Sequence, residues 1–246
     1  MKTALALIGL LALPAAASES AGIFVVVYQA APANRVAFLR ELESSGAKQL
    51  QRWKDEGALQ GYRLLVSRHL DSRTWDAMAI LTVADAARWK KIERDFPAGV
   101  PANVLALASA VETVPANLVR HGERPGGKGE PVFLVIPYEV TVATKEYVAY
   151  LDDYVLPQVA GWAEEGVLDS HAVYLAQYAA GRPWQSLLLL EYRGDEALAA
   201  REAVVAKVRA RLAANAKWKA VSDNKKNLRV ERPPVVADPV SSKEIR

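Results

Sequence analysis

A long internal repeat runs through this sequence. The motif Trp-x-x-Glu-Gly-x-Leu occurs at 53–59 and again at 162–168, and Arg-x-Trp occurs at 73–75 and at 182–184. Both pairs are separated by the same offset of 109 residues, with no gap between them. A fixed offset held over several motifs is the signature of a duplicated structural unit. The sequence therefore predicts two domains of one fold in tandem.

Both copies carry the same order of predicted elements. An apolar, β-rich run opens each copy, at 23–28 and at 132–136, and the common offset aligns Phe24 with Phe133. A helix with apolar residues at helical spacing follows, then a hairpin of two strands, a second helix and a last strand. This βαββαβ order is that of the ferredoxin-like fold.

A single sheet of this kind has helices on one face only, so its other face must be buried elsewhere. Two such sheets in one chain can pack face to face and close around an apolar interior. We therefore predict an α+β fold in which tandem ferredoxin-like βαββαβ repeats form an intramolecular dimeric α+β barrel. The predicted organisation is a signal peptide at 1–17, a first repeat at 22–122, a linker at 123–130, a second repeat at 131–232 and a C-terminal tail at 233–246, whose order the sequence leaves open.

The N-terminus predicts export. Lys2 supplies a positive charge, an apolar run covers 4–13, and Pro14 precedes three alanines that fit a signal-peptidase site after Ala17. The apolar run is shorter than the roughly 20 residues that a membrane-spanning helix requires. We expect an exported protein, periplasmic or secreted, with no transmembrane segment after cleavage.

Composition excludes several kinds of chemistry. The chain has no cysteine, which rules out thiolate metal sites, thiol nucleophiles and disulfides. Its three histidines lack the paired spacing of metal ligands, so no metal is expected. The net charge of +3 comes from scattered basic residues, whereas a nucleic-acid surface needs a concentrated basic stripe. We therefore expect no nucleic-acid partner.

Polar aromatic residues at equivalent positions of the two copies are candidates for lining a pocket. His69 corresponds to Tyr178, and His171 corresponds to Tyr62. Such side chains can hydrogen-bond a ligand. The alternative is that each ring covers the edge of the core while its polar tip reaches water.

The repeated Arg-x-Trp motif gives a second set of candidates. An arginine beside an indole can make a cation–π contact or bind an anionic ligand, although a structural role shared by both copies is more economical. From these two sets we take as ligand-binding candidates His69, Trp75, His171, Tyr178, Arg182 and Trp184.

The element order and the repeated Trp-x-x-Glu-Gly-x-Leu motif resemble the dimeric α+β-barrel superfamily. That group includes antibiotic-biosynthesis monooxygenases, EthD-like and NIPSNAP-like proteins and the tandem chlorite dismutase-like haem proteins, and this chain looks closest to exported members whose functions are not established. The resemblance implies that a haem would be held by a histidine on the first helix of the second repeat. The corresponding segment, 151–157, contains no histidine, so we expect no haem and no other cofactor.

Such folds host many functions, so the fold alone assigns none. We favour a binding protein that holds a small apolar or aromatic molecule in the barrel or in a sheet–helix cleft, because the polar candidates are few and differ between the copies. A cofactor-independent monooxygenase-like enzyme and a structural or assembly module without ligand are the alternatives. An enzyme should have a polar cluster in one repeat only, and a structural module should have both interiors filled. A homo-oligomer is compatible with the sequence.

Overall fold

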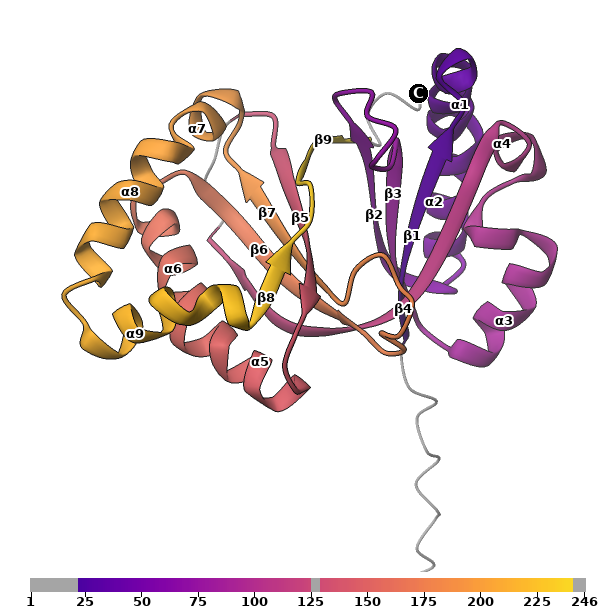
Figure 1. The fold of residues 1–246 in the computed structure, drawn as a ribbon. Coiled ribbons are helices and arrows are strands. Elements are labelled where there is room, and N and C mark those ends of the chain that lie inside the picture. The colour runs from indigo at the N-terminus through magenta and orange to yellow at the C-terminus, as the bar shows by residue number, and fades with distance from the viewer. Residues whose placement is uncertain (1–21, 125–128, 241–246) are drawn as a thin grey trace, which may run out of the picture.

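The structure is a computed structural model that describes residues 22–124 and 129–240 (Figure 1). The predicted signal peptide and most of the Gly-rich part of the linker lie outside these residues. The first repeat consists of β1 (Gly22–Ala30), a 3₁₀ turn (Pro32–Asn34), α1 (Arg35–Glu41), a π-helical turn (Leu42–Gly46), α2 (Ala47–Asp55), β2 (Leu59–Ser67), β3 (Ala77–Val83), α3 (Ala86–Asp95), a 3₁₀ turn (Pro97–Gly99), α4 (Ala102–Leu105) and β4 (Ala108–Glu123).

The second repeat follows the same order. It consists of β5 (Val132–Val140), α5 (Thr144–Tyr150), a π-helical turn (Leu151–Val155), α6 (Leu156–Glu164), β6 (Leu168–Ala176), β7 (Ser186–Tyr192), α7 (Asp195–Ala199), α8 (Arg201–Leu212), α9 (Ala216–Asn224), a 3₁₀ turn (Lys225–Asn227), β8 (Arg229–Glu231) and β9 (Val235–Pro239). The π-helical turn recurs at the same place in both copies, which supports the duplication.

The strands close into an antiparallel barrel of eight strands. Their order is β7-β6-β4-β1-β3-β2-β9-β5, and β5 pairs with β7 to close the barrel. The short strand β8 pairs with the end of β5 and is not one of these eight strands. The α+β-barrel fold predicted from the sequence is therefore confirmed. Helices α1–α4 cover the outer face of the first half and α5–α9 that of the second (Figure 1).

The last strand of each repeat joins the two halves. The first part of β4 pairs with β1, and its second part, from Ala116 to Glu123, pairs with β6 of the other repeat. In the second repeat β9 pairs with both β5 and β2. Residues 235–239, which lie in the segment predicted as the C-terminal tail, therefore contribute a strand to the barrel wall.

Three apolar layers hold the fold together. One lies between the helices and sheet of each repeat, and the third fills the centre of the barrel. Truncating buried side chains of this size costs about 2–5 kcal/mol each, so the packed centre is a major source of stability. The central layer includes Val25, Leu65, Met78, Ile80, Phe133, Val135, Leu187 and Leu189.

The alignment of Phe24 with Phe133 is wrong by one residue. Phe24 faces the helices and stacks on Trp89, whereas Phe133 faces the barrel centre. Phe24 pairs with Leu81 and Leu134 pairs with Leu190, so Leu134 is the structural counterpart of Phe24. A one-residue slip moves each side chain of a strand to the opposite face. The loop after β5 is one residue shorter than the loop after β1, which restores the common offset at the helix.

Candidate functional site

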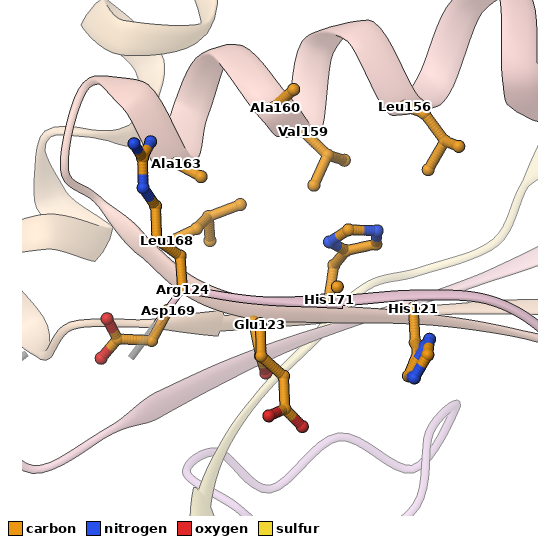
Figure 2. Close-up of a pocket in the computed structure, with 12 residues that line it drawn as sticks. His121, Glu123, Arg124, Leu156, Val159, Ala160, Ala163, Leu168, Asp169 and His171 are labelled. Carbon is orange, nitrogen blue, oxygen red and sulfur yellow. The ribbon is translucent and has the colours of Figure 1, made fainter. Parts of the chain in front are cut away.

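A cleft lies between α6 and the paired strands β4 and β6 in the second repeat. Its volume is about 250 Å³. Helix α6 contributes mostly apolar or small side chains, and His171 of β6 points from the sheet toward them, whereas His121 and Glu123 point to the opposite side of the sheet (Figure 2). The apolar or small lining residues are Leu156, Val159, Ala160, Ala163 and Leu168, and the polar side is formed by His121, Gly122, Glu123, Arg124, Asp169, Ser170 and His171. The Arg124 side chain points to the same side of the sheet as His171 (Figure 2).

The imidazole of His171 fits because its neighbour across the ladder is a glycine. Gly122 pairs with His171, and a Cβ atom on Gly122 would lie only 2.6 Å from the Cε1 atom of His171. Burial lowers the pKa of His171 below its ordinary value of 6.5, and the nearby His121 lowers it further. His171 is therefore neutral at pH 7, and its ring can donate one hydrogen bond and accept another.

The equivalent space in the first repeat is bridged by larger side chains. Tyr62, the counterpart of His171, donates a hydrogen bond of 3.0 Å from its hydroxyl to Oε1 of Gln51 on α2. Gln51 is the counterpart of Ala160. The exchange of a tyrosine and a glutamine for a histidine and an alanine leaves a cleft in the second repeat.

One end of the barrel is hollow and carries both Arg-x-Trp motifs. The β2–β3 connection brings Arg73 and Trp75, and the β6–β7 connection brings Arg182 and Trp184, to the same hollow of about 460 Å³. We call this hollow the tryptophan end. Its other lining residues are Val27, Gln29, Thr74, Met78, Glu112, Pro137, Pro183, Leu187, Arg232, Pro233 and Val235.

The arginines of the tryptophan end pair with carboxylates. Arg73 pairs with Asp71 at 2.9 Å and Arg182 with Glu112 at 3.3 Å. The cation–π contacts within the described residues instead join Arg63 to Phe133 and Arg229 to Tyr138. Among the described residues, neither Arg73 nor Arg182 makes a cation–π contact with the tryptophan of its own motif, and nearby carboxylates hold both guanidinium groups.

The opposite end of the barrel is polar. A hollow of about 370 Å³ there has both Tyr62 and His171 on its border, although the side chain of Tyr62 bonds Gln51 on α2 and that of His171 points toward α6 (Figure 2). Arg63 also lines it and lies 3.6 Å from Glu191, which accepts a hydrogen bond from Ser170.

Two of the six candidates lie away from all of these hollows. His69 is exposed in the connection after β2, and Tyr178 has 69% of its surface exposed in the connection after β6. Neither lines the cleft or an end of the barrel. Both residues come after the end of their strand, so strand pairing does not fix the direction of their side chains toward the interior.

The segment 151–157, where the resemblance stated above would place a haem ligand, does not fit a haem. Its only side chain able to ligate iron through a phenolate is Tyr154, which is 1% exposed and stacked between Tyr150 and Trp218. That ring belongs to the core of the second repeat. Within residues 22–124 and 129–240, no three His, Asp or Glu side chains converge as metal ligands, and no helix is long and apolar enough to cross a membrane.

Two residues that shape the cleft were not predicted from the sequence. Ala160 leaves the space open, and Gly122 admits the ring of His171. A signal for the first was present, because Ala160 aligns with Gln51 inside an otherwise matching helix. Gly122 gave no such signal, since its importance depends on a strand pairing between the two repeats.

Comparisons with solved structures support the fold. A proposed monooxygenase from Lactobacillus acidophilus NCFM superposes with a TM-score of 0.57 at 12% identity, over 91% of this chain and 95% of that chain. An anthrone oxidase-like protein gives 0.57 at 11% identity, over 92% and 93%. A mutant chlorite dismutase from Candidatus Nitrospira defluvii gives 0.54 at 10% identity, over 92% and 93%.

No model of a protein family matches the sequence, and no curated protein matches it. At these identities the structural likeness is one of fold alone. The chain thus has the dimeric α+β-barrel fold that the sequence predicted, with both halves of the barrel supplied by one chain.

Proposed function

We propose that this protein binds a small apolar or aromatic molecule in the cleft between α6 and β6, with His171 as the polar contact. The difference between the two repeats carries the proposal. A duplicated unit with only a packing role has no need to keep one cleft open, and here Tyr62 and Gln51 bridge one copy while His171 and Ala160 leave space in the other.

The size and lining of the cleft indicate the class of ligand. A cavity of roughly 150 Å³ holds benzene, so a cleft of 250 Å³ suits a molecule of one or two rings. Walls that are mostly apolar, with a small number of polar groups, are typical of small-molecule sites. The ligand would carry a hydroxyl or carbonyl group that hydrogen-bonds the imidazole of His171.

The test is to exchange the cleft residues between the repeats. The variant Ala160→Gln with His171→Tyr gives the second repeat the bridging pair of the first, and 2-naphthol serves as the probe in calorimetry and thermal unfolding. At a concentration of 100 Kd, a ligand that binds only the folded state stabilises it by about 2.7 kcal/mol. We expect this stabilisation in the unmodified protein and its loss in the variant.

A matched control keeps the outcome interpretable. Gln51→Ala removes the bridge in the first repeat and should leave binding to the second repeat unchanged. Equal binding of 2-naphthol by the unmodified protein and by the exchange variant would contradict the assignment of the cleft. A failure of a broad panel of one- and two-ring compounds to stabilise the unmodified protein would favour the structural-module alternative.

A cofactor-independent oxygenase is the second candidate, and the neutral state of His171 favours it. A general base must be unprotonated before it acts, and an imidazole in an apolar cleft can accept the proton of a phenolic or enolic substrate. With anthrone as the substrate, the anion then reacts with O₂, and one oxygen atom becomes the new carbonyl of anthraquinone while the other leaves as water with the two hydrogens lost from the substrate carbon. Oxygen consumption with anthrone, measured for the unmodified protein and for His171→Gln, tests this: turnover should be lost in the variant, and turnover equal in both would remove His171 from the chemistry.

Export remains part of the proposal. The N-terminal pattern of a positive charge, an apolar run and small residues supports it. Mass measurement of the mature protein from a cell fractionation checks it, with cleavage after Ala17 expected. A full-length protein confined to the cytoplasm would contradict it.

A further inference from the structure

We infer that the tryptophan end of the barrel is a second binding site, specific for a planar aromatic carboxylate. This site is separate from the cleft between α6 and β6, and it does not depend on the function proposed for that cleft. Three features of the hollow support it: apolar side chains at its base, arginines at its opening, and the ion pair between Arg182 and Glu112.

The floor of the hollow is aromatic and apolar. Trp75 and Trp184 come from equivalent positions of the two repeats and are 7% and 3% exposed. Met78, Leu187 and Val235 complete the floor. Only a small part of each indole and of the thioether borders the hollow, and aromatic rings and thioethers both make favourable contacts with an aromatic ring, so a flat aromatic ligand matches this floor.

The rim is rich in arginine. Three of the described lining residues are arginines, and Glu112 is the one acidic residue among them. Arg73 and Arg232 pair with Asp71 and Glu139, which do not line the hollow. Arg182 is therefore the arginine whose carboxylate partner occupies the hollow itself.

The pair between Arg182 and Glu112 shows where a ligand carboxylate would bind. Its single short approach is 3.3 Å, from Nη1, and the same atom also lies 3.4 Å from the carbonyl oxygen of Thr113. Charge-assisted hydrogen bonds normally measure about 2.7–2.9 Å, and arginine prefers to hold a carboxylate with two parallel bonds. Both side chains are about one-third exposed. A ligand carboxylate can therefore replace Glu112 and bind the guanidinium in the bidentate arrangement that Glu112 does not make.

The size of the hollow agrees with such a ligand. Its 460 Å³ lies within the range of about 300–1,000 Å³ typical of small-molecule sites. A two-ring acid would place its rings against the two indoles and its carboxylate at the rim.

The experiment compares 2-naphthoate with 2-naphthamide, which has the same shape and no charge. Binding is followed by calorimetry and by tryptophan fluorescence, because both indoles of the hollow would contact the ring. We expect 2-naphthoate to bind at least tenfold more tightly than 2-naphthamide, in keeping with the strength of hydrogen bonds to charged groups. Arg182→Gln should remove this preference.

A second variant tests the opposite direction. Glu112→Gln removes the competing carboxylate, so it should tighten 2-naphthoate binding severalfold while it leaves 2-naphthamide unchanged. Arg120→Gln is the matched control, because Arg120 is as exposed as Arg182 and pairs with Asp152 on the surface. This control should bind both probes as the unmodified protein does.

Several results would overturn the inference. Equal affinity for the two probes would show that the rim does not select for charge, and weaker 2-naphthoate binding in Glu112→Gln would show that the ion pair organises the hollow instead of competing for it. Loss of 2-naphthoate binding in Ala160→Gln would place the probe in the cleft. Retention of binding in that variant, together with its loss in Arg182→Gln, supports a separate site at the tryptophan end.

Discussion

Gly161 sets how closely α6, the helix that lines the cleft, packs against α8. A Cβ atom added to Gly161 would lie 2.5 Å from one methyl carbon of Val208 and 3.1 Å from the other, and Val208 is fully buried. Overpacking of this kind costs about 1–3 kcal/mol. Replacing a glycine by alanine inside a helix gains about 0.8–1.0 kcal/mol. Gly161→Ala should therefore destabilise the protein by up to about 2 kcal/mol.

The effect of Gly161→Ala on the free energy of unfolding should change sign once the side chain of Val208 is shortened. In a Val208→Ala background the clash disappears and the helical preference for alanine remains, so Gly161→Ala should stabilise that variant by about 0.8–1.0 kcal/mol. Urea unfolding of the two single variants, the double variant and the unmodified protein gives the interaction energy, expected to be about 1–3 kcal/mol. An equal cost of Gly161→Ala in both backgrounds would refute the reasoning, because it would show that Val208 does not limit the approach of the helices.

Three further changes have expected outcomes. Gly122→Ala should turn the ring of His171 into the cleft and weaken 2-naphthol binding while changing stability by no more than about 1 kcal/mol, since rotamer strain and the entropy gain nearly cancel; undiminished binding would contradict this. Burial depresses the pKa of His171, so the unfolded protein binds more protons than the folded protein, and stability should fall as the pH drops below about 6.5. Thermal unfolding over a series of pH values should show that His171→Gln loses this part of the pH dependence. The same pH dependence in the variant and in the unmodified protein would argue against it. Truncation after Arg232 removes β9 and should lower the urea midpoint sharply, whereas truncation after Val240 should not; equal midpoints would show that β9 does not support the barrel.

The repeat predicted the architecture because its motifs fix the ends of elements. Gly57 and Gly166 both adopt positive φ directly after their helices, so the matching motifs end each helix at the same point. The hairpin positions followed from the same spacing. The prediction that the two sheets face each other followed from the need to bury the second face of each sheet. Strand pairing between the repeats joins the two sheets into one closed barrel.

The errors arose where the sequence pattern carries no directional information. Both faces of β1 and β5 are buried, so apolar residues run continuously and a one-residue slip at Phe133 leaves the pattern unchanged. The strand β9 follows two prolines and is only five residues long. Its partners are β2 and β5, far away in sequence, and no local pattern announces such pairing.

Duplication affects the two proposed sites in opposite ways. The closed barrel brings equivalent residues of the two repeats together at its ends, so identical motifs meet there: Trp75 with Trp184, and Arg73 with Arg182, around one hollow. The layer between sheet and helices in one repeat instead lies on the opposite outer face from that in the other, so the residues that line each layer can differ independently. Identity between the repeats therefore points to the tryptophan end, and the replacement of a bridging tyrosine by His171 points to the cleft. Because the centre of the barrel is packed, a ligand at one site does not contact a ligand at the other, and their affinities should be separable by mutation.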